Sequence, residues 1–183
     1  MTMTARLRRF MLTAHVTFSV GWIGGVIAYV TLGVAAVISQ DTQTVRAAWI
    51  AMELIGWFAI VPLALASLLS GLVMSLGTKW GLFQHYWTLI SLVLTVLATA
   101  VLLMHMPDVS LRADLAQKAE GTRLDALGGD LFHPGLGLVM LLVIQVLNVY
   151  KPRGMTPYGW RKLREQRQPQ PSEPHEPAEV TTT

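Results

Sequence analysis

The sequence contains no cysteine among its 183 residues. This absence excludes disulfides, thiolate metal sites, iron–sulfur clusters and the covalent attachment of c-type haem. Charged residues are scarce at 14% of the chain, whereas soluble domains carry about 25%. A nucleotide-binding loop, a Ser-His-Asp pattern and paired carboxylates in the apolar segments are missing as well. The sequence therefore points away from the common classes of soluble enzyme, and we expect no nucleic-acid partner.

Hydrophobic residues are abundant, at 52% of the chain, and they gather in four long runs. Each run has about 18 residues or more, the length a helix needs to cross a hydrocarbon core of about 30 Å. The first run is too long for the apolar region of a signal peptide, so we expect it to be retained. The sequence predicts an all-α fold, a four-helix transmembrane bundle, with spans at about residues 10–39, 47–76, 83–106 and 131–150.

The segments around these spans divide the chain further. Residues 1–9 form a basic N-terminal segment, residues 10–160 the membrane domain, and residues 161–183 a Pro-, Glu- and Gln-rich tail for which we expect disorder. Pro62 is expected to kink the second helix, and Pro107 to help end the third. The external loop over residues 107–130 has Leu111 and Leu115 at helical spacing. That spacing predicts a short helix on the outer surface.

The basic residues predict the orientation. Most of them lie on one side of the expected membrane: Arg6, Arg8, Arg9, Lys79, Lys151, Arg153, Arg161, Lys162, Arg164 and Arg167. Outside the tail, all the acidic residues fall on the other side. Since basic loops stay in the cytoplasm, both termini are expected there. The predicted location is the bacterial inner membrane, with lipid as the surrounding partner.

Four histidines lie in or beside the expected spans and form two pairs. His15 and His85 lie near the cytoplasmic ends of the first and third helices, and His105 and His133 near the outer ends of the third and fourth. His85 and His105 are about 20 residues apart, or about 30 Å along a helix, so both cannot be deep. Two imidazoles at one depth suit the axial positions of haem b. We therefore predict His15 and His85 as haem ligands.

The outer pair favours a metal ion or an interfacial role. His105 and His133, with Met104, are candidate copper ligands, since imidazole and thioether both suit copper. Met104 and Met106 point about 200° apart on a helix, so they can act with His105 only if the helix has ended. The alternative is that both histidines are interfacial anchors.

The first helix carries further candidates for cofactor binding. Gly21 and Gly25 have the Gly-x-x-x-Gly spacing that lets another backbone or a flat ligand approach closely. His15, Ser19 and Trp22 share the neighbouring face. The glycines thus indicate either close helix packing or a cofactor slot that also involves Trp22. His15 itself is either functional or an interhelical hydrogen-bonding residue.

Several stretches resemble known families. "AHVTFSVGWIGG", "AMELIGWFAIVPLALASLLSGL", "WGLFQHYWTLISLVLTVLAT" and "VYKPRGMTPYG" resemble a bacterial family of four-helix integral membrane proteins, over roughly residues 8–160. That resemblance implies the fold and no activity. The first stretch also resembles the first helix of the copper-resistance D family, with its His and then Trp-x-Gly-Gly. This second resemblance extends to His15, Trp22, Gly24 and Gly25.

Three functions follow from these observations as expectations. The first is a small redox subunit that binds haem b. The second is a copper-handling or transport protein. The third is a non-catalytic membrane subunit with structural histidines. Each could work with other membrane subunits or with a second copy of the chain.

Overall fold

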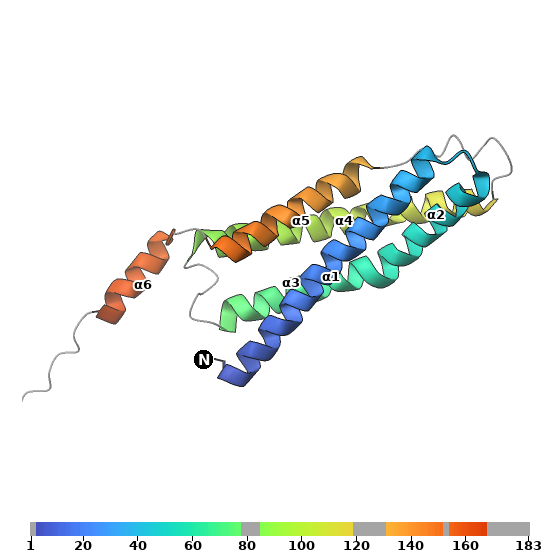
Figure 1. Ribbon diagram of the computed structural model, residues 1–183. Coiled ribbons are helices and arrows are strands. Elements are labelled where there is room, and N and C mark those ends of the chain that lie inside the picture. Colours follow the sequence, from blue (N-terminus) through green and yellow to red (C-terminus); the bar gives the residue numbers. More distant parts are fainter. Residues whose placement is uncertain (1–2, 78–84, 119–130, 152–153, 168–183) are drawn as a thin grey trace, which may run out of the picture.

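The computed structural model describes residues 3–77, 85–118, 131–151 and 154–167, and it is helical over most of this length (Figure 1). Four stretches are long and apolar enough to cross a membrane. They are α1 (Ala5–Ile38), the continuous stretch Thr42–Gly77, α4 (Tyr86–Lys118) and α5 (Phe132–Tyr150). A further helix, α6 (Pro157–Arg167), extends away from them. The predicted all-α fold with four spans is confirmed, and its helices are those of a multi-pass membrane protein.

The stretch Thr42–Gly77 has three parts: α2 (Thr42–Ile55), the π-helical turn η1 (Gly56–Ile60) and α3 (Val61–Gly77). The N–H of Val61 donates to the carbonyl of Gly56, one residue further back than in an α-helix. Pro62 explains this position, because proline lacks an N–H and its ring crowds the carbonyl four residues earlier. The distortion expected from Pro62 therefore lies in the turn directly before it.

The helices form an elongated bundle with two distinct ends. The start of α1, the end of α3, the start of α4 and the end of α5 lie at one end, here named the terminal end (Figure 1). The end of α1 and the starts of α2 and α5 lie at the opposite end, here named the loop end. α1 packs against α2, α3 and α5, and α4 packs against the same three helices. α1 and α4 thus occupy opposite corners of the bundle.

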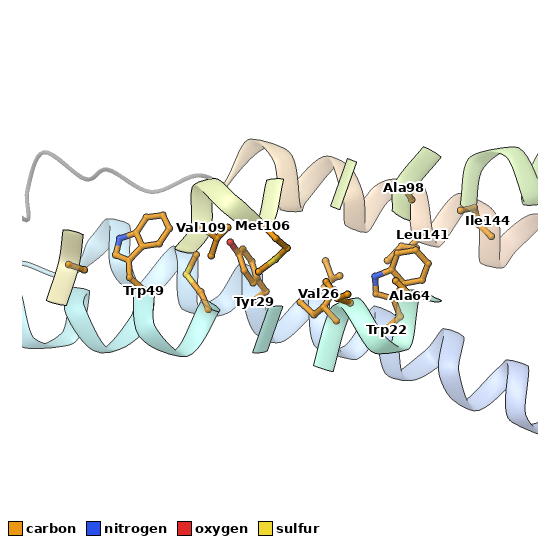
Figure 2. Packing of buried hydrophobic residues seen from close by; sticks show 14 of the residues in the cluster. Trp22, Val26, Tyr29, Trp49, Ala64, Ala98, Met106, Val109, Leu141 and Ile144 are labelled. Carbon is orange, nitrogen blue, oxygen red and sulfur yellow. The ribbon is translucent and has the colours of Figure 1, made fainter. Parts of the chain in front are cut away.

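The core runs along the bundle axis, and its most completely buried side chains lie towards the loop end. Trp49, Met52, Met106 and Val109 are almost fully buried there, and Trp22 and Val26 continue the core towards the terminal end (Figure 2). Many large apolar side chains on the outer faces are exposed instead. In a bilayer such side chains face lipid tails, which are as apolar as they are.

α4 differs from the expectation at Pro107. The helix was expected to end near Met106, and that prediction is wrong, because α4 continues through Pro107 to Lys118. Packing against α2 holds the extension: Val109, Ala113 and Ala116 are buried, and Arg46 Nε donates to the carbonyl of Ala116 at 2.9 Å. Residues 108–118 therefore continue α4 and do not form a separate surface helix, while residues 119–130 lie outside the described residues.

The other boundaries also shift. α1 begins at Ala5, inside the segment expected to precede the membrane domain. α6 reaches Arg167, so helix covers the start of the tail for which disorder was expected, and residues 168–183 lie outside the described residues. Between α1 and α2, Asp41 caps α2 by accepting hydrogen bonds from the Thr44 hydroxyl and from the backbone of Gln43 and Thr44. These bonds hold the pKa of the Asp41 carboxyl below its usual value.

Two neighbouring glycines of α1 give a test of this packing. A Cβ on Gly25 would lie 3.1 Å from Ile60 Cγ1, whereas a Cβ on Gly24 would meet nothing within 4 Å. Gly25→Leu should destabilise the fold by about 1–3 kcal/mol through overpacking, while Gly24→Leu should cause no loss. Thermal unfolding in detergent, followed by circular dichroism, measures both. Equal effects of the two substitutions would contradict the contact between α1 and η1.

Candidate functional site

His15 is tied to α3 through one ring nitrogen. Its Nδ1 lies 3.1 Å from the backbone carbonyl of Ser67 and 3.0 Å from the hydroxyl of Ser70. A carbonyl oxygen only accepts, so Nδ1 carries the proton and donates to Ser67. The Ser70 hydroxyl accepts from the same N–H and donates to the carbonyl of Ala66 at 2.6 Å. In the neutral ring, Nε2 is then a bare acceptor.

Small residues bring α1 and α3 close enough for this contact. A Cβ on Gly71 would lie 3.0 Å from Cε1 of His15, so glycine leaves room for the ring. One turn further along α1, the hydroxyl of Ser19 lies 2.8 Å from that of Ser67 and also bonds to the carbonyl of His15. A short series of polar contacts thus fixes α1 to α3, as is common between membrane helices.

His15 also lines a cavity of about 420 Å³ between α1, α3, α4 and α5, a volume within the usual range of ligand pockets, about 300–1,000 Å³. Arg8, Arg9 and Lys151 line it at the terminal end of the bundle. Apolar side chains such as Leu12 and Leu92 form part of the wall. The polar part of the wall comes from all four helices: His15, Ser67, Ser91, Thr95, Gln145 and Asn148.

Two hydroxyls of α4 in this wall have unused hydrogen-bonding capacity. The oxygens of Thr88 and Ser91 are buried and have no hydrogen-bond partner among the described residues. Ser91 as a whole is 6% exposed. Buried polar groups are nearly always satisfied by protein, water or a ligand. These hydroxyls therefore indicate that the cavity has polar contents.

A second, smaller cavity of about 30 Å³ lies deeper along the same helices. His15, Ser19 and Ser67 line both cavities, and Trp22 lines the smaller one. Its volume suits a water molecule, which needs several polar partners such as those available here. Beyond it, Trp22, Val26 and Ala64 belong to the buried core (Figure 2).

The structure places the other predicted cofactor residues apart from the larger cavity. His85 is not among the described residues that line it; it pairs with Met155 in an isolated bridge and its ring centroid lies 6.3 Å from that of Trp87. Gly21 and Gly25 face Leu63 and Ile60, so they serve close helix packing. Gly24, part of the second resemblance, has open space around it.

The outer pair of histidines does come together at the loop end. The ring centroids of His105 and His133 lie 5.0 Å apart with an interplanar angle of 29°. Met104 is 80% exposed and Met106 only 1%, so these two side chains point to different sides of α4. Since α4 continues through Pro107, Met104 and Met106 cannot both join His105. Within the described ranges, no three His, Cys, Asp or Glu residues gather around a possible metal ion.

Several residues of the cavity wall were not predicted from the sequence. Thr88, Ser91 and Thr95 follow a helical spacing along α4, and Gln145 and Asn148 are three residues apart on α5. Both patterns put polar side chains on one face of an otherwise apolar helix. That spacing was the available signal, because polar residues in a span usually face the bundle interior.

No family model, curated protein or solved structure matches this chain. The family resemblances noted in the sequence therefore stay predictions, and the residues of the site are the basis for any functional proposal.

Two serines of α3 give a test of the His15 contact. The hydroxyls of Ser70 and Ser75 both bond to a carbonyl of α3, but only that of Ser70 also reaches His15. Ser70→Ala should lower the free energy of unfolding by about 0.6 kcal/mol more than Ser75→Ala, the average for such interhelical bonds. Unfolding in mixed micelles measures both variants. Equal losses would mean that the Ser70–His15 bond contributes nothing.

Proposed function

We propose that this protein is an integral membrane protein that binds a ligand in the His15 cavity, with Nε2 of His15 as the group that contacts the ligand. The observation that carries the proposal is the orientation of the ring. Nδ1 is occupied by the carbonyl of Ser67, and the ring lines the larger cavity. Ligating histidines are typically held in this way, with the second nitrogen bonded to a backbone carbonyl that fixes the tautomer.

Haem b is the ligand that we propose for this cavity. His15 would hold the haem iron through Nε2, and the wall of the cavity combines apolar side chains with polar groups, as the haem macrocycle and its carboxylates would need. Bound haem would supply one-electron chemistry. The chain's own residues would orient His15 through Ser67 and Ser70, and Trp22 and the core beyond it would close the inner end of the site.

The second axial ligand predicted from the sequence has less support. His85 does not share the cavity with His15 in the described part of the chain. A haem held here would therefore have His15 as its one histidine ligand. This differs from the bis-histidine arrangement, with both His15 and His85 as ligands, that the matched depths of these residues predicted.

The orientation and location are part of the same proposal. Both ends of the membrane domain lie at the terminal end of the bundle, which carries Arg6, Arg8 and Arg9. Asp41, Asp108 and Asp114 belong to segments at the loop end. This asymmetry supports a cytoplasmic terminal end in a bacterial inner membrane. A redox subunit of this kind would exchange electrons with other membrane subunits or with a second copy.

Copper binding at the loop end is a second candidate, favoured by the stacked rings of His105 and His133. Two imidazoles from α4 and α5 could hold a copper ion. Met104 points away from the bundle and is not proposed as a ligand. If neither ligand binds, the third expectation remains, a membrane subunit whose histidines are structural.

The haem proposal is tested by absorption spectra of the purified protein in detergent after addition of haem. The wild-type protein should develop a Soret band of a haem with one histidine ligand. His15→Ala should abolish or convert this spectrum, whereas His85→Ala should leave it intact. Loss of the spectrum in both variants would restore the bis-histidine arrangement, and a colourless wild-type protein would exclude haem.

The copper proposal is tested by metal analysis and copper titration of the same preparation. His105→Ala and His133→Ala should each weaken binding by about tenfold or more, since removing even a supporting group of a metal ligand costs that much. Met104→Ala is the matched control on α4 and should bind as the wild type does. Copper binding that both histidine variants retain would contradict this site.

A further inference from the structure

The larger cavity carries positive charge at one end. Arg8 and Arg9 of α1 and Lys151 at the end of α5 line it at the terminal end. None of the described residues that line the cavity is acidic. Cations that converge on a recess with apolar walls raise the local concentration of anions. Near a membrane surface, where the effective dielectric constant is below that of water, this attraction is stronger.

The deeper wall has a different character. Ser91 and Thr88 present hydroxyls without partners among the described residues, and Gln145 and Asn148 add amide groups. Leu12, Val16, Leu68 and Leu92 line the same cavity. A molecule that matches both the basic end of the cavity and its deeper wall has an anionic group at one end. The rest of such a molecule is largely apolar, with a few hydrogen-bonding groups.

We propose that the occupant of the His15 cavity is an amphipathic anion, with its carboxylate or phosphate at Arg8, Arg9 and Lys151 and its body between α1, α3, α4 and α5. This inference deepens the proposed ligand binding, but it does not depend on haem. The same chemistry, an anionic group on a largely apolar body, occurs in haem with its carboxylates and in an anionic phospholipid taken from the bilayer. These cases differ in the length of the apolar body and in whether the molecule comes from the bilayer.

The distribution of charge over the chain supports this assignment. The described acidic residues whose side chains are defined are Asp41, Glu53, Asp108 and Asp114. All of them belong to α2, α4 or the segment between α1 and α2. None of these acidic residues forms an ion pair with Arg8 or Arg9 in the described part of the chain. Arg8 and Arg9 therefore remain available to a ligand.

The test uses the full-length protein, stripped of lipid in detergent. The probes are phosphatidylglycerol, phosphatidylcholine, haem and inorganic phosphate, and binding is measured by thermal shift and by native mass spectrometry. The two variants compared first are Arg8→Gln/Arg9→Gln and Arg6→Gln. Arg6 lies in the same basic segment but does not line the cavity, so it is the matched control for surface charge.

We expect phosphatidylglycerol to bind more tightly than phosphatidylcholine. Arg8→Gln/Arg9→Gln should weaken it by about tenfold or more, since each basic residue near an anionic lipid surface contributes about 1 kcal/mol. Arg6→Gln should bind as the wild type does. Ser91→Ala, which removes only a hydroxyl, should also weaken binding, by several-fold. That second effect distinguishes a ligand inside the cavity from lipid on the outer surface.

Some of the remaining outcomes identify which anion binds, and the others overturn the inference. If haem binds and phosphatidylglycerol does not, the anionic group is that of the haem carboxylates. If only inorganic phosphate binds, the inference is overturned, because the occupant then has no apolar body. Equal affinity for the two lipids, or equal affinity in the double variant and Arg6→Gln, overturns the inference. Haem binding that depends on His15 but not on Arg8 and Arg9 would overturn it while leaving the proposed function standing.

Discussion

The hydrogen bond from the ring of His15 to the carbonyl of Ser67 is the contact on which the rest of the site depends. It joins α1 to α3, and because a carbonyl can only accept, it also fixes which ring nitrogen carries the proton. In lipid, an ionisable ring and a backbone carbonyl both need partners within the protein. One contact thus fulfils a packing requirement and orients Nε2. The close approach at Gly71 follows from it, since a larger residue would displace the ring.

The two ends of the bundle perform different structural tasks. Towards the loop end, Trp49, Met52, Met106 and Val109 fill the interior, and Arg112 lies 5.6 Å from the Trp49 ring centre. Towards the terminal end, the interior holds the larger cavity, whose wall combines polar residues with apolar ones such as Leu12 and Leu92. Beyond the larger cavity, Trp22, Val26 and Ala64 are buried in the core, so its inner end borders on packed residues.

The fold could be predicted from the sequence because lipid imposes simple demands on it. Length and apolarity suffice to find four spans. The course of α4 past Pro107 could not be predicted in this way, because contacts of Val109, Ala113 and Ala116 with the rest of the bundle decide it. Pro62 shows the opposite case: its effect is local, so the sequence placed the distortion within a turn.

The sequence gives the position of each candidate residue along its helix. It does not give the direction in which the side chain points around the helix axis. Counting residues along a helix gives the depth of a side chain, since each residue adds 1.5 Å. The direction that the side chain faces depends on the packing of all four helices. His105 and His133 lie on α4 and α5, which pack against each other, and their rings meet. His15 and His85 belong to α1 and to the start of α4, which occupy opposite corners of the bundle. His85 is not among the described residues that line the cavity beside His15, so equal depth along two helices does not by itself place two side chains in one site.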